Sequence, residues 1–221
     1  MARKPLPLPN LLLVEGKDDE HTIYALVTHY KVPETFRVKN KEGDSNLKKD
    51  AFAYLLETLD TELDASGLEN LGIVIDADED LAKRWESLSQ LLRNVGYADI
   101  PVSPTPDGTI IVQESRPTVG IWLMPDNQLP GMLEHFIEFL VPPDDILWER
   151  ARNCVASIPE NERPFRPQHQ IKADIYTWLA WKEQPGKPLG QSITMRYFDA
   201  NLPQAQTFIS WIQRLFVGTK E

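Results

Sequence analysis

Short apolar runs alternate with longer amphipathic segments through the first half of the chain. The run Leu11–Glu15 is nearly uninterrupted, and Gly72–Asp76 has the same character, which is typical of strands buried on both faces of a parallel sheet. Thr35–Lys39 is a weaker strand candidate between them, and a polar loop over residues 39–45 follows it. Helical spacing of apolar residues predicts helices over Asp18–Tyr30, Leu47–Leu63 and Leu81–Val95. This alternation predicts right-handed crossovers and a mostly parallel sheet flanked by helices.

The second half of the chain predicts two short strands and then helices. Thr109–Val112 and Val119–Met124 are separated by a turn, which favours a hairpin or an edge of the same sheet. Helical segments follow at Met132–Leu140, Asp144–Ile158, Lys172–Lys182 and Pro203–Phe216. The predicted fold class is therefore α/β, with an α/β domain over residues 1–140 and a helical C-terminal extension over residues 141–221 packed on it.

Composition limits the partners and the compartment. The 221 residues include 33 acidic and 23 basic side chains, and a formal charge of −10 disfavours loose attraction to nucleic acid or to an anionic membrane. The single cysteine, Cys154, excludes an intrachain disulfide and fits a reducing cytosol. We find no secretory signal, and no apolar run approaches the roughly 20 residues that cross a bilayer. We therefore expect a cytoplasmic protein without a membrane partner, in which any polyanion is held locally.

Carboxylates stand where two of the predicted strands end. Glu15 closes the first strand, Asp76 closes the third, and Asp78 lies two residues farther on. Because ligands collect at the carboxyl ends of parallel strands, we expect these three side chains to converge. Converging carboxylates raise one another's proton affinity, and a hard divalent cation relieves this by taking oxygen ligands. The pattern therefore predicts a Mg²⁺ or Mn²⁺ site. The histidines show no ligand spacing and are left out of that site: His21, His29, His135 and His169.

Helix capping is the alternative explanation for several acids. Asp18, Asp19 and Glu20 stand where a helix begins, and acids there accept hydrogen bonds from free amides and suit the helix dipole. The segment DEDLAKRW, at residues 78–85, would start a helix in the same way. Capping does not account for Glu15 and Asp76, because both lie on the strand side of their turns.

The segments LLLVEGKDD and IVIDADED resemble the two signatures of the TOPRIM fold, which topoisomerases, bacterial primases and overcoming-lysogenization-defect nucleases share. In that family a glutamate ends the first strand and an aspartate-x-aspartate pair ends the third; here these are Glu15, Asp76 and Asp78. The resemblance spans roughly residues 10 to 125 and implies a TOPRIM-like, Rossmann-type sheet. Two later segments, WLMPDNQLPGMLEHFI and KADIYTWLAWKEQPGKPLGQSI, resemble stand-alone TOPRIM-like bacterial proteins of unknown function.

The nuclease branch of the TOPRIM family implies further site residues. An acid four residues after the glutamate, a later acid and a C-terminal lysine complete its two-metal site, and here the matching positions are Asp19, Glu134 and Lys172. Simpler explanations are an exposed helical acid for Glu134 and a solvated lysine at a helix start for Lys172. Asp126 and Asn127 follow another strand and are further candidates, although PDN is ordinary turn chemistry.

This resemblance implies metal-dependent phosphodiester chemistry on nucleic acid, most simply hydrolysis by a two-metal nuclease. Lys172 would offset charge in the transition state, and Glu15 is alternatively a general acid or base. One ion would be held by Asp76 and Asp78, and the other by Glu15, Asp19 and Glu134. The sequence contains no GxxxxGK[ST] nucleotide loop. Members of the nuclease branch commonly work with an ATPase, so we expect weak nucleic-acid binding by this acidic chain alone and an ATPase as its partner.

Two other functions stay open. Phosphatases of the haloacid-dehalogenase kind also place an aspartate pair after an apolar strand, and Asp76 would then attack phosphorus, although that nucleophile usually ends the first strand. A non-catalytic interaction or regulatory domain is the second alternative. Aromatic residues near the C-terminus would then form a docking or homodimer face, or they simply pack the helices onto the sheet: Trp178, Trp181, Phe198, Trp211 and Phe216.

Basic residues after the second predicted strand form a candidate rim for a polyanion. A solvated helix face is the simpler explanation of the same residues: Arg37, Lys39, Lys41, Lys48 and Lys49.

Overall fold

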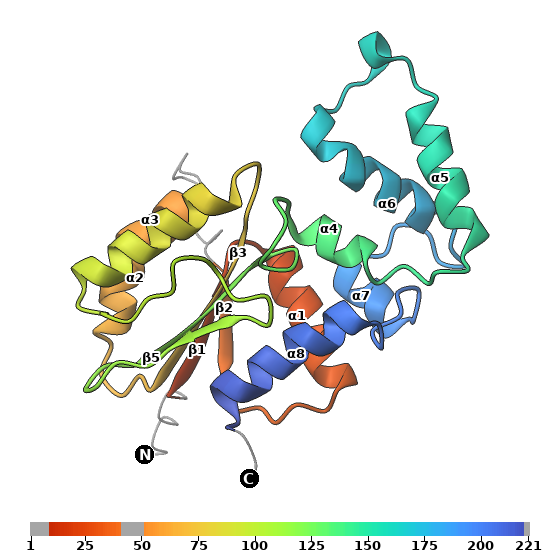
Figure 1. Cartoon of the computed structure of the whole chain (residues 1–221). Helices are drawn as coiled ribbons and strands as arrows, with labels where there is room; N and C mark the ends of the chain where they lie inside the picture. Colours follow the sequence, from red (N-terminus) through yellow and green to blue (C-terminus); the bar gives the residue numbers. More distant parts are fainter. Residues whose placement is uncertain (1–8, 41–50, 219–221) are drawn as a thin grey trace, which may run out of the picture.

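The protein is built around one five-stranded sheet with helices on both faces (Figure 1). The computed structural model describes residues 9–40 and 51–218, so most of the predicted loop at 39–45 and the predicted helix start at 47–50 lie outside the described residues. The strand order is β2-β1-β3-β5-β4. The strands are β1 (Asn10–Val14), β2 (Arg37–Asn40), β3 (Asn70–Asp76), β4 (Thr109–Ile111) and β5 (Thr118–Met124). The predicted α/β class is confirmed.

The sheet is parallel except at one edge. β1 pairs with β2 and with β3, and β3 pairs with β5, all in parallel, whereas β4 runs antiparallel to β5. Both sequence expectations for the last two strands therefore hold, because they form an antiparallel pair at an edge of the common sheet. β1 is buried along its whole length, as its uninterrupted apolar run indicates.

Alternate residues of the strands pack into two separate cores, one on each face of the sheet. Leu11 and Leu13 pack under α2 (Ala51–Leu63) and α3 (Leu81–Asn94), while Leu12 and Val14 face α1 (Lys17–His29) and α8 (Pro203–Phe216). This alternation follows from the two-residue period of a strand. The core under α2 and α3 is formed by these two helices, the strands and the segment that follows α3. The core on the opposite face includes residues from α1 and from every helix after β5.

Two paired glycines allow α8 to approach the sheet closely. Gly72 of β3 lies opposite Gly120 of β5 in the strand register. A Cβ atom added to Gly120 would lie 2.4 Å from Leu215 Cδ2, and one added to Gly72 would lie 2.9 Å from the Phe216 ring. Any larger residue at these positions would push the end of α8 away from the sheet.

The helices after residue 140 divide into two groups. α5 (Ile146–Ala156) and α6 (Gln170–Ala180) pack against each other and project beyond the sheet, whereas α7 (Leu189–Thr194) packs on α1 and α8 on the sheet (Figure 1). α4 (Leu133–Glu138) joins the groups through its contact with α6. α7 was not predicted, because its short segment LGQSIT carries no extended apolar periodicity. Two 3₁₀ turns, Glu160–Glu162 and Pro167–His169, connect α5 to α6.

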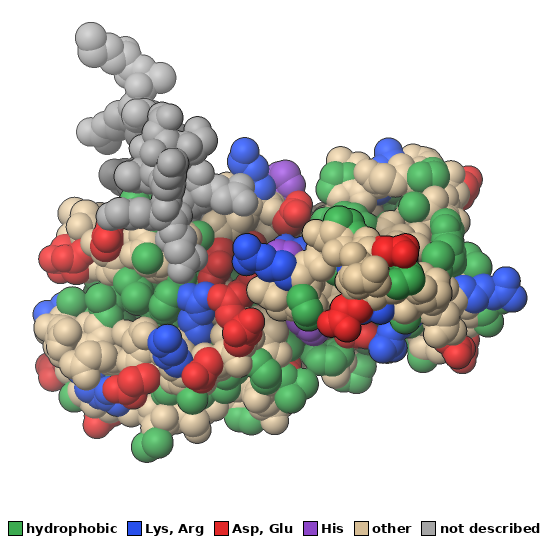
Figure 2. Space-filling view, turned by 90° about the horizontal axis from the view of Figure 1, so that it is seen from above, with side chains coloured by type: hydrophobic (Ala, Val, Ile, Leu, Met, Phe, Trp, Pro, Cys, Tyr) green, Lys and Arg blue, Asp and Glu red, His purple; other side chains and the backbone are tan. Residues whose placement is uncertain are grey.

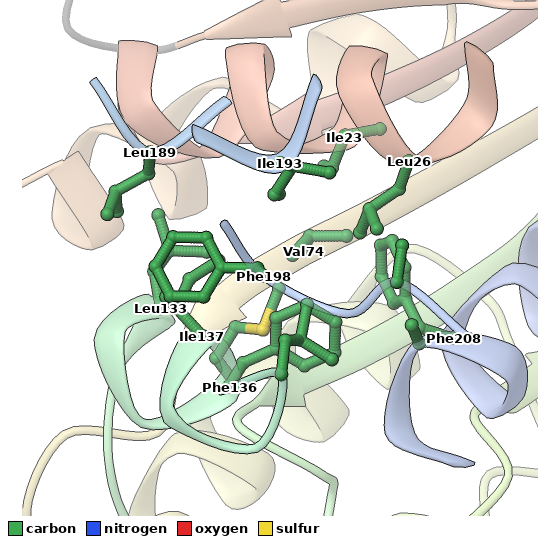
Figure 3. Close-up of a cluster of buried hydrophobic side chains, with 14 of the residues drawn as sticks. Ile23, Leu26, Val74, Leu133, Phe136, Ile137, Leu189, Ile193, Phe198 and Phe208 are labelled. Atoms are coloured by element: carbon green, nitrogen blue, oxygen red, sulfur yellow. The ribbon is translucent and has the colours of Figure 1, made fainter. Parts of the chain in front are cut away.

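One continuous apolar core links α1, α4, α7 and α8 to the sheet. Figure 3 shows its centre, where Val74 of β3 lies among side chains from all four helices and from the segment before α8: Ile23, Leu26, Leu133, Phe136, Ile137, Leu189, Ile193, Phe198 and Phe208. Of the aromatic residues proposed as a docking face, Trp178, Phe198, Trp211 and Phe216 are buried, which confirms the packing explanation for those four; Trp181 is 42% exposed. Within the described residues, no helix is long and apolar enough to cross a membrane.

Candidate functional site at the carboxyl edge of the sheet

Four carboxylates meet where β1 and β3 end. Asp76 is the last residue of β3, Glu15 follows β1 directly, and Asp19 lies in the first turn of α1. Glu134, in the first turn of α4, completes what we call the carboxylate cluster. Asp19 and Glu134 are buried, with only 7% and 4% of their surface exposed. Glu15 and Asp76 are half-buried. Four neighbouring acids withdrawn this far from water require strong local compensation.

Backbone amides provide part of that compensation. The Asp76 amide donates to Glu15 Oε1 at 3.1 Å, which ties the ends of β1 and β3 together. The Leu133 amide donates to Asp76 Oδ1 at 2.9 Å and holds the start of α4 against the sheet. The Gly16 amide donates to Asp19 Oδ2 at 3.1 Å, which is the capping bond expected of an acid at that position. Asp19 Oδ1 is buried and has no hydrogen-bond partner among the described residues.

The remaining repulsion shifts the proton affinities. Burial, followed by the charges of Glu15 and Glu134, raises the pKa of Asp76 to about 8, and the Leu133 amide and Lys172 only partly oppose this increase. Burial and the charges of Asp76 and Glu134 hold the pKa of Asp19 well above its ordinary value. Carboxyl groups that retain protons near neutral pH are characteristic of functional sites, because their environment favours a cation that the fold itself does not fully supply.

Within the described residues, Lys172 of the projecting helix α6 is the cation that contacts this cluster. Its Nζ lies 3.1 Å from Glu134 Oε1, and its side chain is 45% exposed. The interpretation of Glu134 as an exposed helical acid was wrong, and Lys172 is not merely solvated. Tyr176, four residues later on α6, was missed; burial, Asp18 and Glu134 raise its pKa to about 12. The four-residue spacing from Lys172 was the available sequence signal.

Asp78 lies in different surroundings from Asp76. Its backbone has a φ of 52°, its amide donates to the Gly131 carbonyl oxygen, and its carboxylate pairs with Arg84. The Asp78 side chain is 49% exposed. Arg84 in turn lies over the Phe52 ring, with its guanidinium carbon 4.0 Å from the ring centroid. The expected convergence therefore brings Glu15 to Asp76, while Asp78 turns toward α3.

Other predicted acids serve as caps and turns. Asp80 Oδ1 accepts a hydrogen bond from the Lys83 amide at the start of α3, so the capping explanation of DEDLAKRW is confirmed. Asp126 Oδ1 accepts from the Gln128 and Leu129 amides, and Asn127 Oδ1 accepts from the Leu123 amide. The turn explanation for residues 126 and 127 is thus confirmed as well.

The proposed basic rim is only partly within the described residues. Arg37 is exposed on β2, and Lys39 Nζ lies 2.5 Å from Glu62 Oε1. Lys41, Lys48 and Lys49 lie outside the described residues.

A cleft of about 1190 Å³ lies beside the carboxylate cluster. The first turn of α3, the loop before α4, and helices α4, α5 and α6 form its walls. Asp78, Arg84, His135, Arg152 and Asp174 are among the side chains that line it. Figure 2 looks onto this end of the molecule and shows acidic and basic side chains interspersed, with histidines between the two parts of the body. The cleft is large enough for a segment of a polymeric substrate.

The cluster offers only hard oxygen ligands and one unpartnered buried oxygen, Asp19 Oδ1, which suits Mg²⁺ or Mn²⁺. Across residues 9–40 and 51–218, however, no group of three or more His, Cys, Asp and Glu side chains is already arranged to hold an ion. The amide bonds to Glu15, Asp19 and Asp76 explain this, because each turns a carboxylate toward the backbone. The residue types fit a divalent cation, but their present orientations do not form a complete ligand set.

Comparison with known proteins places the chain without assigning it an activity. The model of a family described as "Protein of unknown function (DUF3226)" matches residues 9–217. No curated protein and no solved structure matches the chain.

Proposed function

The chain belongs to this family of proteins of unknown function, DUF3226, and we propose from its site that it is a Mg²⁺- or Mn²⁺-dependent phosphodiesterase acting on nucleic acid. The observation that carries the proposal is the carboxylate cluster, in which the pKa of Asp76 is raised to about 8 at the carboxyl edge of a parallel sheet. That edge is where open α/β sheets bind ligands. The resemblance to TOPRIM nucleases assigns the same acids to metal binding.

In the proposed site, a divalent cation would be held by Glu15, Asp19, Asp76 and Glu134. A divalent ion bound there would polarise a phosphoryl oxygen and lower the pKa of a bound water. Lys172 Nζ lies 3.1 Å from Glu134 Oε1, so its ammonium group would be close enough to offset negative charge on a phosphodiester bound at the cluster. The cleft is lined by the sequence neighbours of Asp76, Glu134 and Lys172, namely Ala77, His135 and Ile171, so a polymer lying in it would pass close to these groups.

Cation binding requires the cluster to relax rather than to refold. Asp19, Asp76 and Glu134 are each held by an amide or ammonium contact at one oxygen, and a carboxylate oxygen has further lone pairs with which to bind a cation. Small side-chain rotations on the fixed strand ends would bring these oxygens together. The net charge of −10 opposes binding of long polyanions, so the proposed activity would be weak in isolation and strengthened by a partner.

Calorimetry with Mn²⁺ tests the proposal most directly. Wild-type protein at low ionic strength should bind Mn²⁺, and Asp76→Asn should weaken binding by more than about a hundredfold, since even outer partners of ligands contribute 10–100-fold. The same samples should nick supercoiled plasmid with Mn²⁺, and nicking should stop in EDTA and in Asp76→Asn. Asn preserves the shape of the side chain and its acceptor for the Leu133 amide, so a folding defect is not expected.

Failure of wild-type protein to bind Mn²⁺, even with DNA present, would sink the metal-dependent mechanism. Binding without nicking would separate the cation site from the reaction.

A second candidate is a non-catalytic regulatory domain. It is favoured by one observation: in the described part of the chain, no three potential ligands already form a metal site. In that case the amide bonds to Glu15, Asp19 and Asp76 would be the final arrangement of the acids. The protein would then bind no divalent ion, and its thermal midpoint would be the same in Mn²⁺ and in EDTA.

A further inference from the structure

The first turn of α4 serves the carboxylate cluster and the cleft at once. Leu133 donates its amide to Asp76, and Glu134 reaches into the cluster. The next residue, His135, lines the cleft. Consecutive residues on a helix point about 100° apart, so one turn can present an acid to the cluster and an imidazole to the cleft.

The His135 ring is held in one tautomer. Its Nδ1 accepts a hydrogen bond from the Met132 amide at 3.2 Å, which is the same capping position that Asp19 occupies in α1. A nitrogen that accepts from an amide carries no proton, so the neutral ring must carry its proton on Nε2. The ring is therefore oriented with Nε2–H as a donor that the capping bond does not use.

Gly131 makes room for this arrangement. Its φ is 147°, and a Cβ atom built on it would lie 2.9 Å from His135 Nδ1. A residue with a side chain would displace the ring and break the capping bond. The backbone conformation before α4 is thus matched to an imidazole in this orientation.

The other polar groups of the cleft are mostly committed. Arg84 pairs with Asp78, and Arg152 Nη1 lies 3.9 Å from Glu138 Oε1. Asp174 accepts a hydrogen bond from Gln170. Lys83 lines the cleft and has no ion-pair partner among the described residues. Among the described lining residues, the donors that no other contact uses are His135 Nε2–H, the Lys83 ammonium and the side chains of Gln168 and His169. These are the groups that an anionic oxygen would engage, and of them only the His135 ring is fixed in orientation by a capping bond.

We propose that His135 Nε2–H donates a hydrogen bond to a non-bridging phosphate oxygen of a nucleic-acid strand lying in the cleft. The inference rests on the proposed function and extends it, because it assigns a substrate-binding role to a residue that is not a metal ligand. His135 positions the strand, and a cation held by Glu134, one residue earlier on α4, and its neighbouring acids would act on a neighbouring phosphate.

Two substitutions separate the capping role of His135 from its substrate role. His135→Asn retains an acceptor near Nδ1 for the Met132 amide and lacks a donor at the Nε2 position. His135→Gln places an amide nitrogen where Nε2–H lies. The control is His21→Asn, a histidine on α1 outside the cleft. Binding of a fluorescein-labelled thymidine 20-mer is followed by anisotropy at low ionic strength in EDTA, so that cleavage cannot occur.

We expect His135→Asn to weaken oligonucleotide binding about tenfold, as loss of a charge-assisted hydrogen bond predicts. The affinity of His135→Gln should stay within about threefold of the wild-type affinity, and the affinity of His21→Asn should equal that of wild type. In ¹⁵N spectra of the histidine rings, the neutral His135 ring should show its proton on Nε2. Wild-type binding in His135→Asn, no binding by wild-type protein, or an Nδ1–H tautomer would each overturn the proposal.

The proposed function and this inference can fail independently. Asp76→Asn should lose nicking and keep its oligonucleotide affinity in EDTA, because Asp76 does not line the cleft. If oligonucleotide binding depends on His135 but no nicking occurs, the proposed nuclease activity is wrong and the proposed role of His135 stands. If His135→Asn nicks and binds as wild type does, the role of His135 is wrong and the nuclease activity stands.

Discussion

The carboxylate cluster and the cleft meet at the first turn of α4, yet they balance charge in opposite ways. In the cleft, Asp78 pairs with Arg84, and Glu138 pairs with Arg152. In the cluster, four acids share one partly exposed lysine, Lys172. Solvent-accessible ion pairs contribute little to stability, whereas buried like charges destabilise the fold and raise the pKa of the acids involved. The comparison teaches that acid content alone does not mark a site, and that uncompensated burial does.

The largest expected contrast is in the pH dependence of stability in EDTA. The pKa of the Asp76 carboxyl is 3.8 in the unfolded chain and about 8 in the folded protein. Below about pH 4 both states are protonated, so the group contributes nothing. Between about pH 4 and pH 8 only the folded state holds the proton, so the free energy of unfolding falls as pH rises, by on the order of 5 kcal/mol. Above about pH 8 the full penalty is present.

Asp76→Asn should abolish most of this slope. In urea titrations the variant should match wild type near pH 4 and be the more stable protein near pH 8.5, because Asn carries no charge at either pH. Asp78→Asn is the matched control in the cleft and should follow the wild-type curve. Parallel curves for wild type and Asp76→Asn would mean that the cluster does not repel a charge at Asp76.

A smaller contrast is expected between Lys172, at the cluster, and Lys83, in the cleft, in their effects on the free energy of unfolding. Lys172→Met should lower the free energy of unfolding by about 1–2 kcal/mol, because it leaves the buried Glu134 without its cation; the exposure of Lys172 keeps the loss below that of a fully buried pair. Lys83→Met, in the cleft, should change stability by less than about 0.5 kcal/mol. Urea unfolding at pH 7 in EDTA measures both. Equal effects would show that Glu134 is compensated by something other than Lys172.

The smallest expected effect is that of Asp78→Asn on Mn²⁺ affinity. Because the Asp78 side chain turns to Arg84 and away from the buried acids, its substitution should change the Mn²⁺ dissociation constant by less than about threefold. Calorimetry beside Asp76→Asn makes the comparison direct. A tenfold loss would mean that Asp78 leaves Arg84 and becomes a ligand, as the aspartate-x-aspartate pattern predicts.

The strands and the meeting of Glu15 with Asp76 could be predicted from sequence, because uninterrupted apolar runs and the geometry of parallel strand ends are local properties. The position of Asp78 could not, since it depends on a left-handed backbone conformation and on an arginine from α3. Likewise, Glu134 looks like an exposed helical acid until α6 covers it. The cleft depends on how α5 and α6 project, which no local pattern encodes.

The glycine pair in β3 and β5 has a consequence for the order of folding. Gly72 and Leu215 are in contact where α8 approaches the sheet, and they are separated by 143 residues (215 − 72). Contacts so distant in sequence form late, because closing a long loop is entropically unfavourable before they are made. The part of this sheet face around Gly72 and Trp122, which α8 covers, is therefore expected to stay open until α8 docks. During that interval it is the surface through which a newly made chain would aggregate or engage a chaperone.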